Sequence, residues 1–287
     1  GRTTGVTVIV TGTDTILFEF DCGGSENLGI LPIETREKTV TWFRGYRYYG
    51  GFEYQRVSGG NINVINVVDL EDYVKCVIPW EMSKDWPVEA LKAQAIAAHS
   101  YALYCRDHAA EPASGWLSVD PVRRQGYLTD AVLRSYWGTA YEENYARLSA
   151  LVDSVLTDVL YYGSAPAGTS YFAISNGMTE ASENVWGTAL PYLVAVDSST
   201  DLNADNYLYT VQFTAEQMQQ ALAGLGLLPD PAAPVSWFGE AALTPSGYVA
   251  SLPVCGQSVT GPALRKALAA LPGSLTVFIV SQRAASL

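Results

Sequence analysis

The feature that most constrains the fold is a long alanine-rich segment between Pro87 and His108. Proline suits the first turn of a helix, where its missing N–H needs no partner, and Asp85 lies just ahead at the positive end of the helix dipole. Mostly small residues then recur at spacings of three and four, at Leu91, Ala95, Ala98 and Ala102. The pattern predicts a long helix that is buried and closely approached by its neighbours.

The residues before this helix predict β structure. Short runs rich in β-branched and aromatic residues, at 6–10, 15–20, 39–43 and 62–68, are separated by clusters of Gly, Ser and Asn. Such runs are typical of strands. A short helix is expected over 69–77, ended by Pro79, because proline cannot continue the hydrogen bonds of a helix.

Helices and strands are both expected after the long helix. We predict helices over 142–154, over AEQMQQALAGL after a cap at Thr214, and over GPALRKALAAL. A hairpin is expected over 158–175, and strands at PYLVAV, YLYTVQF, GYVASLPV and LTVFIV. Strands and helices do not alternate strictly, which favours an α+β fold. It has a β-rich N-terminal part, the long buried helix and a mixed α/β C-terminal part.

Composition narrows the classes of function. The chain has 287 residues, 48% hydrophobic and 16% charged, as expected of a globular protein. Its net charge of −12 argues against binding nucleic acid or an anionic membrane surface. No apolar run is long enough to cross a membrane, and no signal segment is visible in this chain.

The four cysteines, Cys22, Cys76, Cys105 and Cys255, are far apart and follow no paired spacing. Buried thiols are therefore favoured over one or two disulfides.

The stretch IPWEM raises a chemical question, because Glu81 is flanked by Trp80 and Met82. Apolar surroundings favour the protonated form of a carboxyl group. In the helix that follows, Lys92 and His99 are seven residues apart and share a face. Gln94 and Tyr101 form a second such pair. A cleft there could gather a carboxyl, an ammonium and an imidazole. The alternative, which spacing alone favours, is a solvated Lys92 and a hydrogen-bonded core His99.

Several segments resemble the stage II sporulation protein D (SpoIID/LytB-type) family. The strongest is NVVDLEDYVKCVIPWEM followed by WPVEALKAQAIAAHSYAL. RQGY, SYFAISNGMTE with the later NVWG and PYL, and SGYVASLPVCGQSVTGPALRKAL follow in the family's order. Together they cover most of the chain from about Arg44 onward. The resemblance implies a SpoIID-like catalytic core over 61–200, preceded by a β-rich segment over 1–60. An α/β segment over 201–287 would pack on the core.

The resemblance implies a peptidoglycan lytic transglycosylase with a glycan-binding cleft. Such enzymes cleave the MurNAc–GlcNAc bond of glycan strands, here expected to be peptide-stripped, and leave 1,6-anhydro-MurNAc ends without consuming water. Glu81 falls on the family's catalytic glutamate, which serves as general acid and then base. No cofactor is implied. The implied location is extracytoplasmic, with glycan strands as partner and a wall amidase or endopeptidase as a candidate second partner.

We expect substrate-binding residues at Lys92, His99, Gln94, Tyr101, Ser175, Thr179 and Tyr192, and the resemblance carries over Lys92 and Tyr192 among them. Two positions depart from its pattern. His99 stands where the family usually has arginine, and Val194 follows PYL where lysine is frequent. Histidine cannot reproduce the bidentate fork of arginine. These departures keep open a non-catalytic peptidoglycan-binding or assembly protein on the same fold.

Metal and thiol chemistry are less favoured. Cys105 and His108 offer two ligands where a closed zinc site needs four, so we expect no metal site. A thiol hydrolase using Cys105 or Cys76 ranks below both glycan hypotheses.

Overall fold

The computed structural model describes residues 5–9, 15–21, 28–31, 40–56, 61–108, 125–205, 207–208 and 211–271. The chain forms two compact units, Gly1–Tyr171 and Phe172–Leu287. Both combine helices with small antiparallel sheets, which confirms the mixed α and β content. The division between the units falls inside the expected 61–200 core. The division into 1–60, 61–200 and 201–287 stays a prediction.

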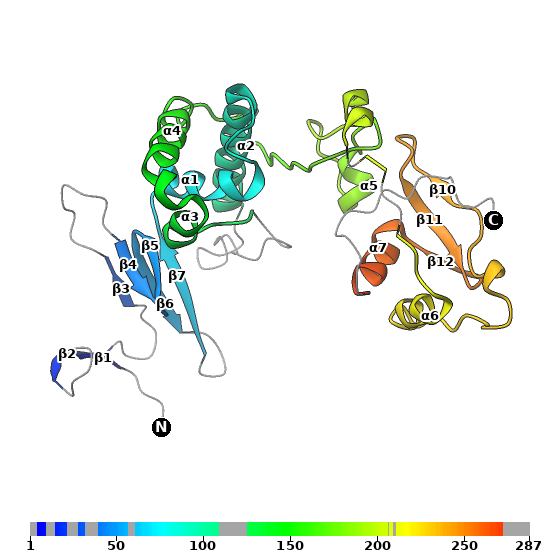
Figure 1. The fold of residues 1–287 in the computed structure, drawn as a ribbon, viewed down its shortest axis with the longest axis horizontal. Coiled ribbons are helices and arrows are strands. Elements are labelled where there is room, and N and C mark those ends of the chain that lie inside the picture. The colour runs from blue at the N-terminus through cyan, green and yellow to red at the C-terminus, as the bar shows by residue number, and fades with distance from the viewer. Residues whose placement is uncertain are drawn as a thin grey trace. The chain divides into compact units, whose positions relative to one another are not determined.

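The first unit begins with strands (Figure 1). β1 (Gly5–Ile9) pairs with β2 (Ile16–Asp21), β4 (Val40–Phe43) with β5 (Tyr46–Tyr49), and β6 (Gly51–Arg56) lies between β3 (Leu28–Ile30) and β7 (Ile62–Val67). The four predicted strands are confirmed to within one residue at each end. Arg44 and Gly45, both with positive φ, make the two-residue turn between β4 and β5, as tight hairpins require.

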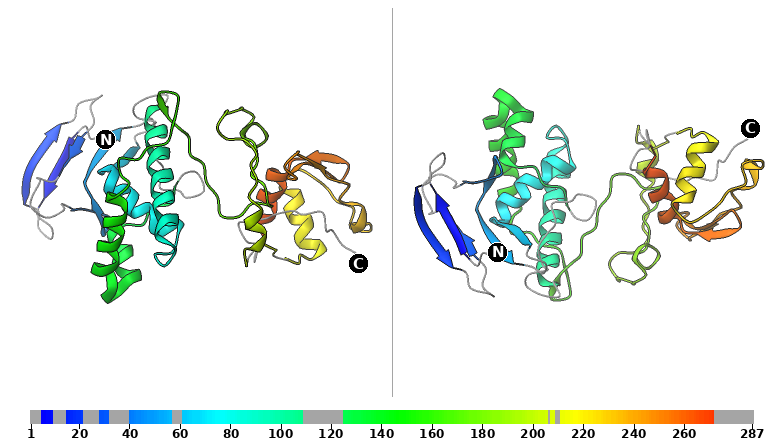
Figure 2. Two further views of the ribbon diagram at one scale, coloured as in Figure 1. Left: turned by 90° about the horizontal axis from the view of Figure 1, so that it is seen from above. Right: turned by 90° about the horizontal axis from the view of Figure 1, so that it is seen from below.

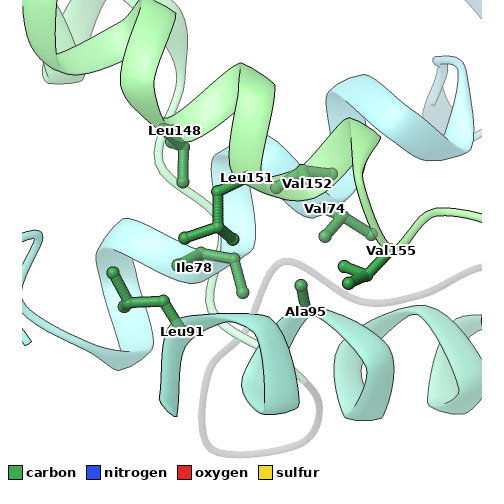
Figure 3. Close-up of a cluster of buried hydrophobic side chains, with 8 residues drawn as sticks. All are labelled: Val74, Ile78, Leu91, Ala95, Leu148, Leu151, Val152 and Val155. Carbon is green, nitrogen blue, oxygen red and sulfur yellow. The ribbon is translucent and has the colours of Figure 1, made fainter. Parts of the chain in front are cut away.

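Helices form the core of the first unit. They are α1 (Leu70–Glu81), α2 (Val88–Asp107), α3 (Asp130–Trp137), a 3₁₀ turn (Gly138–Ala140) and α4 (Tyr141–Asp153). Figure 3 shows apolar side chains of α1, α2 and α4 pointing toward one another, among them Ile78, Leu91 and Leu148. The helices predicted for α2 and α4 are confirmed. The apolar stripe of α2 is buried as expected, since Leu91, Ala95, Ala98 and Ala102 are each at most 6% exposed.

The prediction that Pro79 ends its helix is wrong. α1 contains Pro79 and runs on to Glu81, and the Met82 N–H donates to the Ile78 carbonyl at 2.9 Å. Ile78 is 2% exposed and packs in the core, so tertiary packing outweighs the local preference against helix before and at a proline. This extra turn carries Glu81 to the end of the helix.

The hairpin predicted over 158–175 is present but short. β8 (Tyr161–Tyr162) pairs with β9 (Ala165–Pro166), and Gly163 has the positive φ that the turn needs. After this hairpin the first unit ends at Tyr171.

The second unit packs helices on a small sheet. It contains α5 (Ser182–Trp186), α6 (Ala215–Ala223), α7 (Gly261–Ala269), 3₁₀ turns at Ser199–Asn203 and Pro234–Ser236, and the antiparallel strands β10 (Ala242–Leu243), β11 (Val249–Val254) and β12 (Gln257–Val259). Figure 2 shows α6 (yellow) and α7 (orange-red) side by side next to the β11–β12 hairpin. Thr214 forms a full capping box with Gln217, which confirms the predicted cap of α6.

The strand predicted at PYLVAV is wrong. Residues 191–193 form a turn, and Thr179 instead fixes the segment after it, donating to the Val194 carbonyl at 3.1 Å and accepting from the Val196 N–H at 2.9 Å. The described residues of YLYTVQF form no strand. The strand predicted at LTVFIV lies outside the described residues.

Candidate functional site

The site is built around Glu81, the last residue of α1. Its Oε1 accepts a hydrogen bond from the Gly126 N–H at 3.3 Å, across a separation of 45 residues. The Trp80 indole also meets Gly126: a Cβ there would lie 2.0 Å from Trp80 Cδ1, far inside van der Waals contact. Gly126 therefore has room for no side chain. The carboxylate and the indole share one glycine as their support.

The segment that carries Gly126 is fixed by Gln125. This side chain is 4% exposed; its Nε2 donates to the Ala98 carbonyl at 3.3 Å, and its Oε1 accepts from the Tyr73 hydroxyl at 2.8 Å. Gln125 thus ties the segment to α2 through Ala98 and to α1 through Tyr73. The Leu128 N–H adds a hydrogen bond to the Cys76 carbonyl at 2.9 Å.

Tyrosines surround Glu81. The Tyr171 hydroxyl is buried and reaches no hydrogen-bond partner at standard geometry among the described residues. Burial raises the pKa of Tyr171 most, and the charge of nearby Glu81 raises it further. Burial also raises the pKa of Tyr73 most. The charges of four nearby residues raise it further: Tyr171, Cys105, Tyr101 and Glu81. Tyr73 and Tyr171 therefore place two poorly solvated hydroxyls near this carboxylate, and Tyr101 lies near both of them.

The two residue pairs predicted on α2 lie on different sides of the helix. Tyr101 belongs to the group around Glu81, since its charge would act on both Tyr73 and Tyr171. Gln94, two turns earlier on the same side, has a buried Nε2 without a hydrogen-bond partner among the described residues. His99 is two residues from Tyr101, or about 200° around the axis. One pair thus faces the Glu81 region and the other is turned away from it.

His99 and Lys92 have other neighbours. His99 is 6% exposed, and burial lowers its pKa, with the backbone of Asp158 partly offsetting the effect. Burial therefore favours a neutral ring where the family usually has a cation. Lys92 Nζ pairs with Glu89 Oε1 at 3.1 Å on the same helix. Substrate-binding roles for both residues remain predictions.

Ser175, Thr179 and Tyr192 belong to the second unit. Ser175 is 1% exposed; its N–H donates to Asp201 Oδ2 at 2.8 Å, and its Oγ accepts from the Gly177 N–H at 3.1 Å. Hydrogen bonds from Ser175 lower the pKa of Asp201. Ser175 and Thr179 thus hold turns in place, and Tyr192 is half-buried. Their substrate-binding roles stay predictions.

Several residues of the site escaped sequence reasoning. Gly126 and Gln125 lie in the segment RQGY, which carried a family resemblance but no stated role. Trp80 was considered only as an apolar neighbour of Glu81. Tyr171 lies in the segment SYFAISNGMTE, which also carried the resemblance but no stated role, and its approach to Glu81 cannot be predicted from local pattern.

Cysteine and metal chemistry find no support around Cys105. His108 Nδ1 lies 3.0 Å from the Tyr104 carbonyl oxygen, and its ring stacks on Tyr104 with centroids 4.1 Å apart. Cys76, Cys105 and Cys255 are thiols; Cys22 lies outside the described residues. Across the described ranges, no three His, Cys, Asp or Glu side chains gather as metal ligands would. None of the described helices combines the length and apolar character of a membrane span.

A small, mostly apolar pocket lies on the side of α1 that faces α2 and α4. It is lined by Ile78, Pro79, Met82, Lys84, Leu91, Trp137, Asn144, Arg147, Leu148 and Leu151. Glu81 is not part of its lining. The expected glycan-binding cleft therefore remains a prediction.

Comparison with known proteins gives a consistent family. Residues 58–162 match the family model described as Stage II sporulation protein, SpoIID. Stage II sporulation protein D of Bacillus subtilis (strain 168) is 36% identical over 204 residues, which are 70% of this chain and 58% of the relative. That of Bacillus amyloliquefaciens is 32% identical over 203 residues, with the same coverage.

A more distant relative is the amidase enhancer of Bacillus subtilis (strain 168), 27% identical over 179 residues, which are 62% of this chain and 21% of that protein. The chain spans little more than half the length of the sporulation proteins that it matches. The matched segment contains Glu81, Gly126 and both pairs of α2. The chain belongs to the stage II sporulation protein (SpoIID) family.

Proposed function

We propose that this protein is a lytic transglycosylase of peptidoglycan glycan strands, with Glu81 as general acid and base. The observation that carries the proposal is the setting of Glu81: a helix-end carboxylate held by one backbone N–H, near half-buried tyrosines and beside a half-exposed indole. Membership of the SpoIID family and the relative named an amidase enhancer support a role in the cell wall. We propose a location outside the cytoplasmic membrane, where such a role is exercised, and a wall amidase as a candidate partner.

The proposed reaction needs a single carboxyl group. Glu81 gives its proton to the glycosidic oxygen as the bond from MurNAc C1 to that oxygen breaks. The MurNAc C6 hydroxyl then attacks C1 and passes its proton to the Glu81 carboxylate. The products are a 1,6-anhydro-MurNAc end and a free GlcNAc 4-hydroxyl, so no water is consumed and the acid is regenerated. Ordinary glycosidases instead divide these tasks between two carboxyl groups.

The surroundings of Glu81 suit this exchange. The Gly126 N–H engages Oε1, which leaves the second carboxylate oxygen for the proton. The Tyr171 hydroxyl, buried and without a partner of standard geometry, has a hydrogen bond to offer to the carboxylate or the substrate. A hydrogen bond from a hydroxyl positioned in this way is stronger than in water, because the surroundings are less polar.

The test is product analysis with peptide-free glycan strands. We expect fragments one water lighter than hydrolysis products, seen by mass spectrometry, and a loss of about 10²- to 10⁴-fold in rate for Glu81→Gln. Glu143→Gln, an exposed glutamate in the first turn of α4, is the matched control and should cleave normally. Hydrolytic products, or equal rates for Glu81→Gln and the wild type, would contradict the proposal.

A second function is favoured by one observation. The buried His99, with its lowered pKa, supplies no cation at a position where the family usually has one. A glycan-binding or assembly protein on the same fold fits this loss. It would bind the strands and leave them intact, with Glu81→Gln binding as the wild type does.

A further inference from the structure

We propose that the Trp80 indole is a sugar-stacking subsite that receives the apolar face of an N-acetylhexosamine next to Glu81. The inference rests on the proposed function and names the part of the substrate that this site holds. It adds a binding residue whose identity the family resemblance did not assign.

The first argument is proximity. A Cβ lies about 1.5 Å from its Cα, as carbon–carbon bonds in the backbone do, so Trp80 Cδ1 is within about 3.5 Å of the Gly126 Cα. Glu81 Oε1 is 3.3 Å from the N atom of the same residue. The indole and the carboxylate oxygen are therefore less than about 9 Å apart. A sugar on the ring would have its glycosidic bond in reach of Glu81.

The second argument is support combined with exposure. Contact with Gly126 fixes the ring, whereas 47% of the residue remains exposed. A ring that is already held loses little conformational freedom when a ligand covers it. Trp86 is a suitable comparison, since it is 53% exposed and lies in the loop between α1 and α2.

The third argument concerns charge. The chain carries a net charge of −12, which gives no general attraction to muramoyl carboxylates. An indole face attracts the C–H side of a sugar through contact and burial of apolar surface, which needs no opposite charge. Binding at Trp80 should therefore depend little on salt, unlike binding through exposed cations.

The experiment measures binding separately from cleavage. In the Glu81→Gln protein, a peptide-free tetrasaccharide of alternating N-acetylglucosamine and N-acetylmuramic acid is titrated by calorimetry at low and high salt. Added Trp80→Ala should raise Kd about tenfold, which equals about 1.4 kcal/mol. Trp80→Phe should recover part of the affinity, and Trp86→Ala should leave Kd unchanged. Thermal unfolding of each variant checks the fold.

The outcomes separate this inference from the proposed function. Unchanged affinity in Trp80→Ala, an equal loss in Trp86→Ala, or no measurable binding by the Glu81→Gln protein would overturn the subsite. Trp80-dependent binding together with a wild-type protein that leaves the strands intact would support the subsite and refute cleavage. Cleavage that depends on Glu81, together with binding that does not depend on Trp80, would support cleavage and refute the subsite.

Discussion

Two carboxylates of the first unit differ sharply in their surroundings. Asp130 is fully buried and receives hydrogen bonds from the hydroxyls of Tyr49, at 2.9 Å, and Tyr141, and from Arg134 Nε at 3.0 Å, with Arg47 Nε 3.4 Å away. Glu81 is partly exposed and is held by the long hydrogen bond from Gly126. A carboxylate with saturated acceptors can only hold elements together, whereas one with a spare oxygen is available for chemistry.

The electrostatics of Asp130 support the same distinction. Burial alone would oppose its ionisation, but hydrogen bonds from Tyr141, Tyr49 and Arg134 outweigh burial and hold the pKa of Asp130 below its usual value. These partners come from β5, α3 and α4, so the charge joins the strands of the first unit to its helices.

The largest expected effect is loss of stability at Asp130. Asp130→Asn should lower the free energy of unfolding by about 3–5 kcal/mol, because the buried Tyr49 and Tyr141 hydroxyls and the Arg134 guanidinium lose the carboxylate charge that they bind. Because the folded pKa is lowered, the stabilisation is present above the unfolded pKa of about 3.9 and is lost as pH falls through the folded value. Urea unfolding of both proteins from pH 7 down to about pH 2 measures the loss and its pH dependence.

Glu142→Gln is the control for Asp130, since Glu142 accepts from the same Arg134, at 3.1 Å, but is 82% exposed in its side chain. It should cost less than about 1 kcal/mol. Similar losses of unfolding free energy in the two variants would mean that the buried hydrogen bonds of Asp130 give it no special role in stability.

A smaller effect is expected at Gly126. Gly126→Ala would place a methyl group against the Trp80 ring, so it should cost about 1–3 kcal/mol and displace both the indole and Glu81. The double variant with Trp80→Ala should recover stability, as thermal unfolding would show. Gly29→Ala, where a Cβ meets nothing within 4 Å, is the control. Additive losses in the double variant would mean that the two residues do not press on each other.

The smallest expected effect on stability is at Tyr171. Tyr171→Phe removes a buried hydroxyl that lacks a partner of standard geometry, so stability should change by less than about 1 kcal/mol. Cleavage should fall about tenfold if this hydroxyl serves Glu81, equivalent to about 1.4 kcal/mol of barrier. Tyr127→Phe, another buried hydroxyl of the first unit, should cleave normally. Unchanged cleavage in Tyr171→Phe would assign the hydroxyl no part in the reaction.

Local pattern predicted elements well where packing agrees with it. The alanine spacing of α2 and the capping box at Thr214 depend on neighbours within a few residues, and both are confirmed. The prediction that the helix ends at Pro79 was wrong because burial of Ile78 keeps α1 helical for one more turn. The strand predicted from the apolar run at 191–196 does not form because the hydroxyl of Thr179 binds the backbone of that segment.

The site was only partly predictable for a geometric reason. Spacing on α2 puts Lys92 with His99 and Gln94 with Tyr101, but it cannot tell which face of the helix meets Glu81. That depends on how Gln125 and Tyr73 fix the returning segment. Hydrogen bonds between residues so distant in sequence leave no periodic signal.

The shared glycine has a consequence for variation among related chains. The Trp80 ring fills the space that a side chain at position 126 would need. A residue larger than glycine at 126 is therefore tolerated only if the ring at 80 becomes smaller or moves. Residues that touch in this way change together. We expect the two positions to vary together, with the size of one residue limiting the size of the other, while the Gly126 N–H continues to hold Glu81.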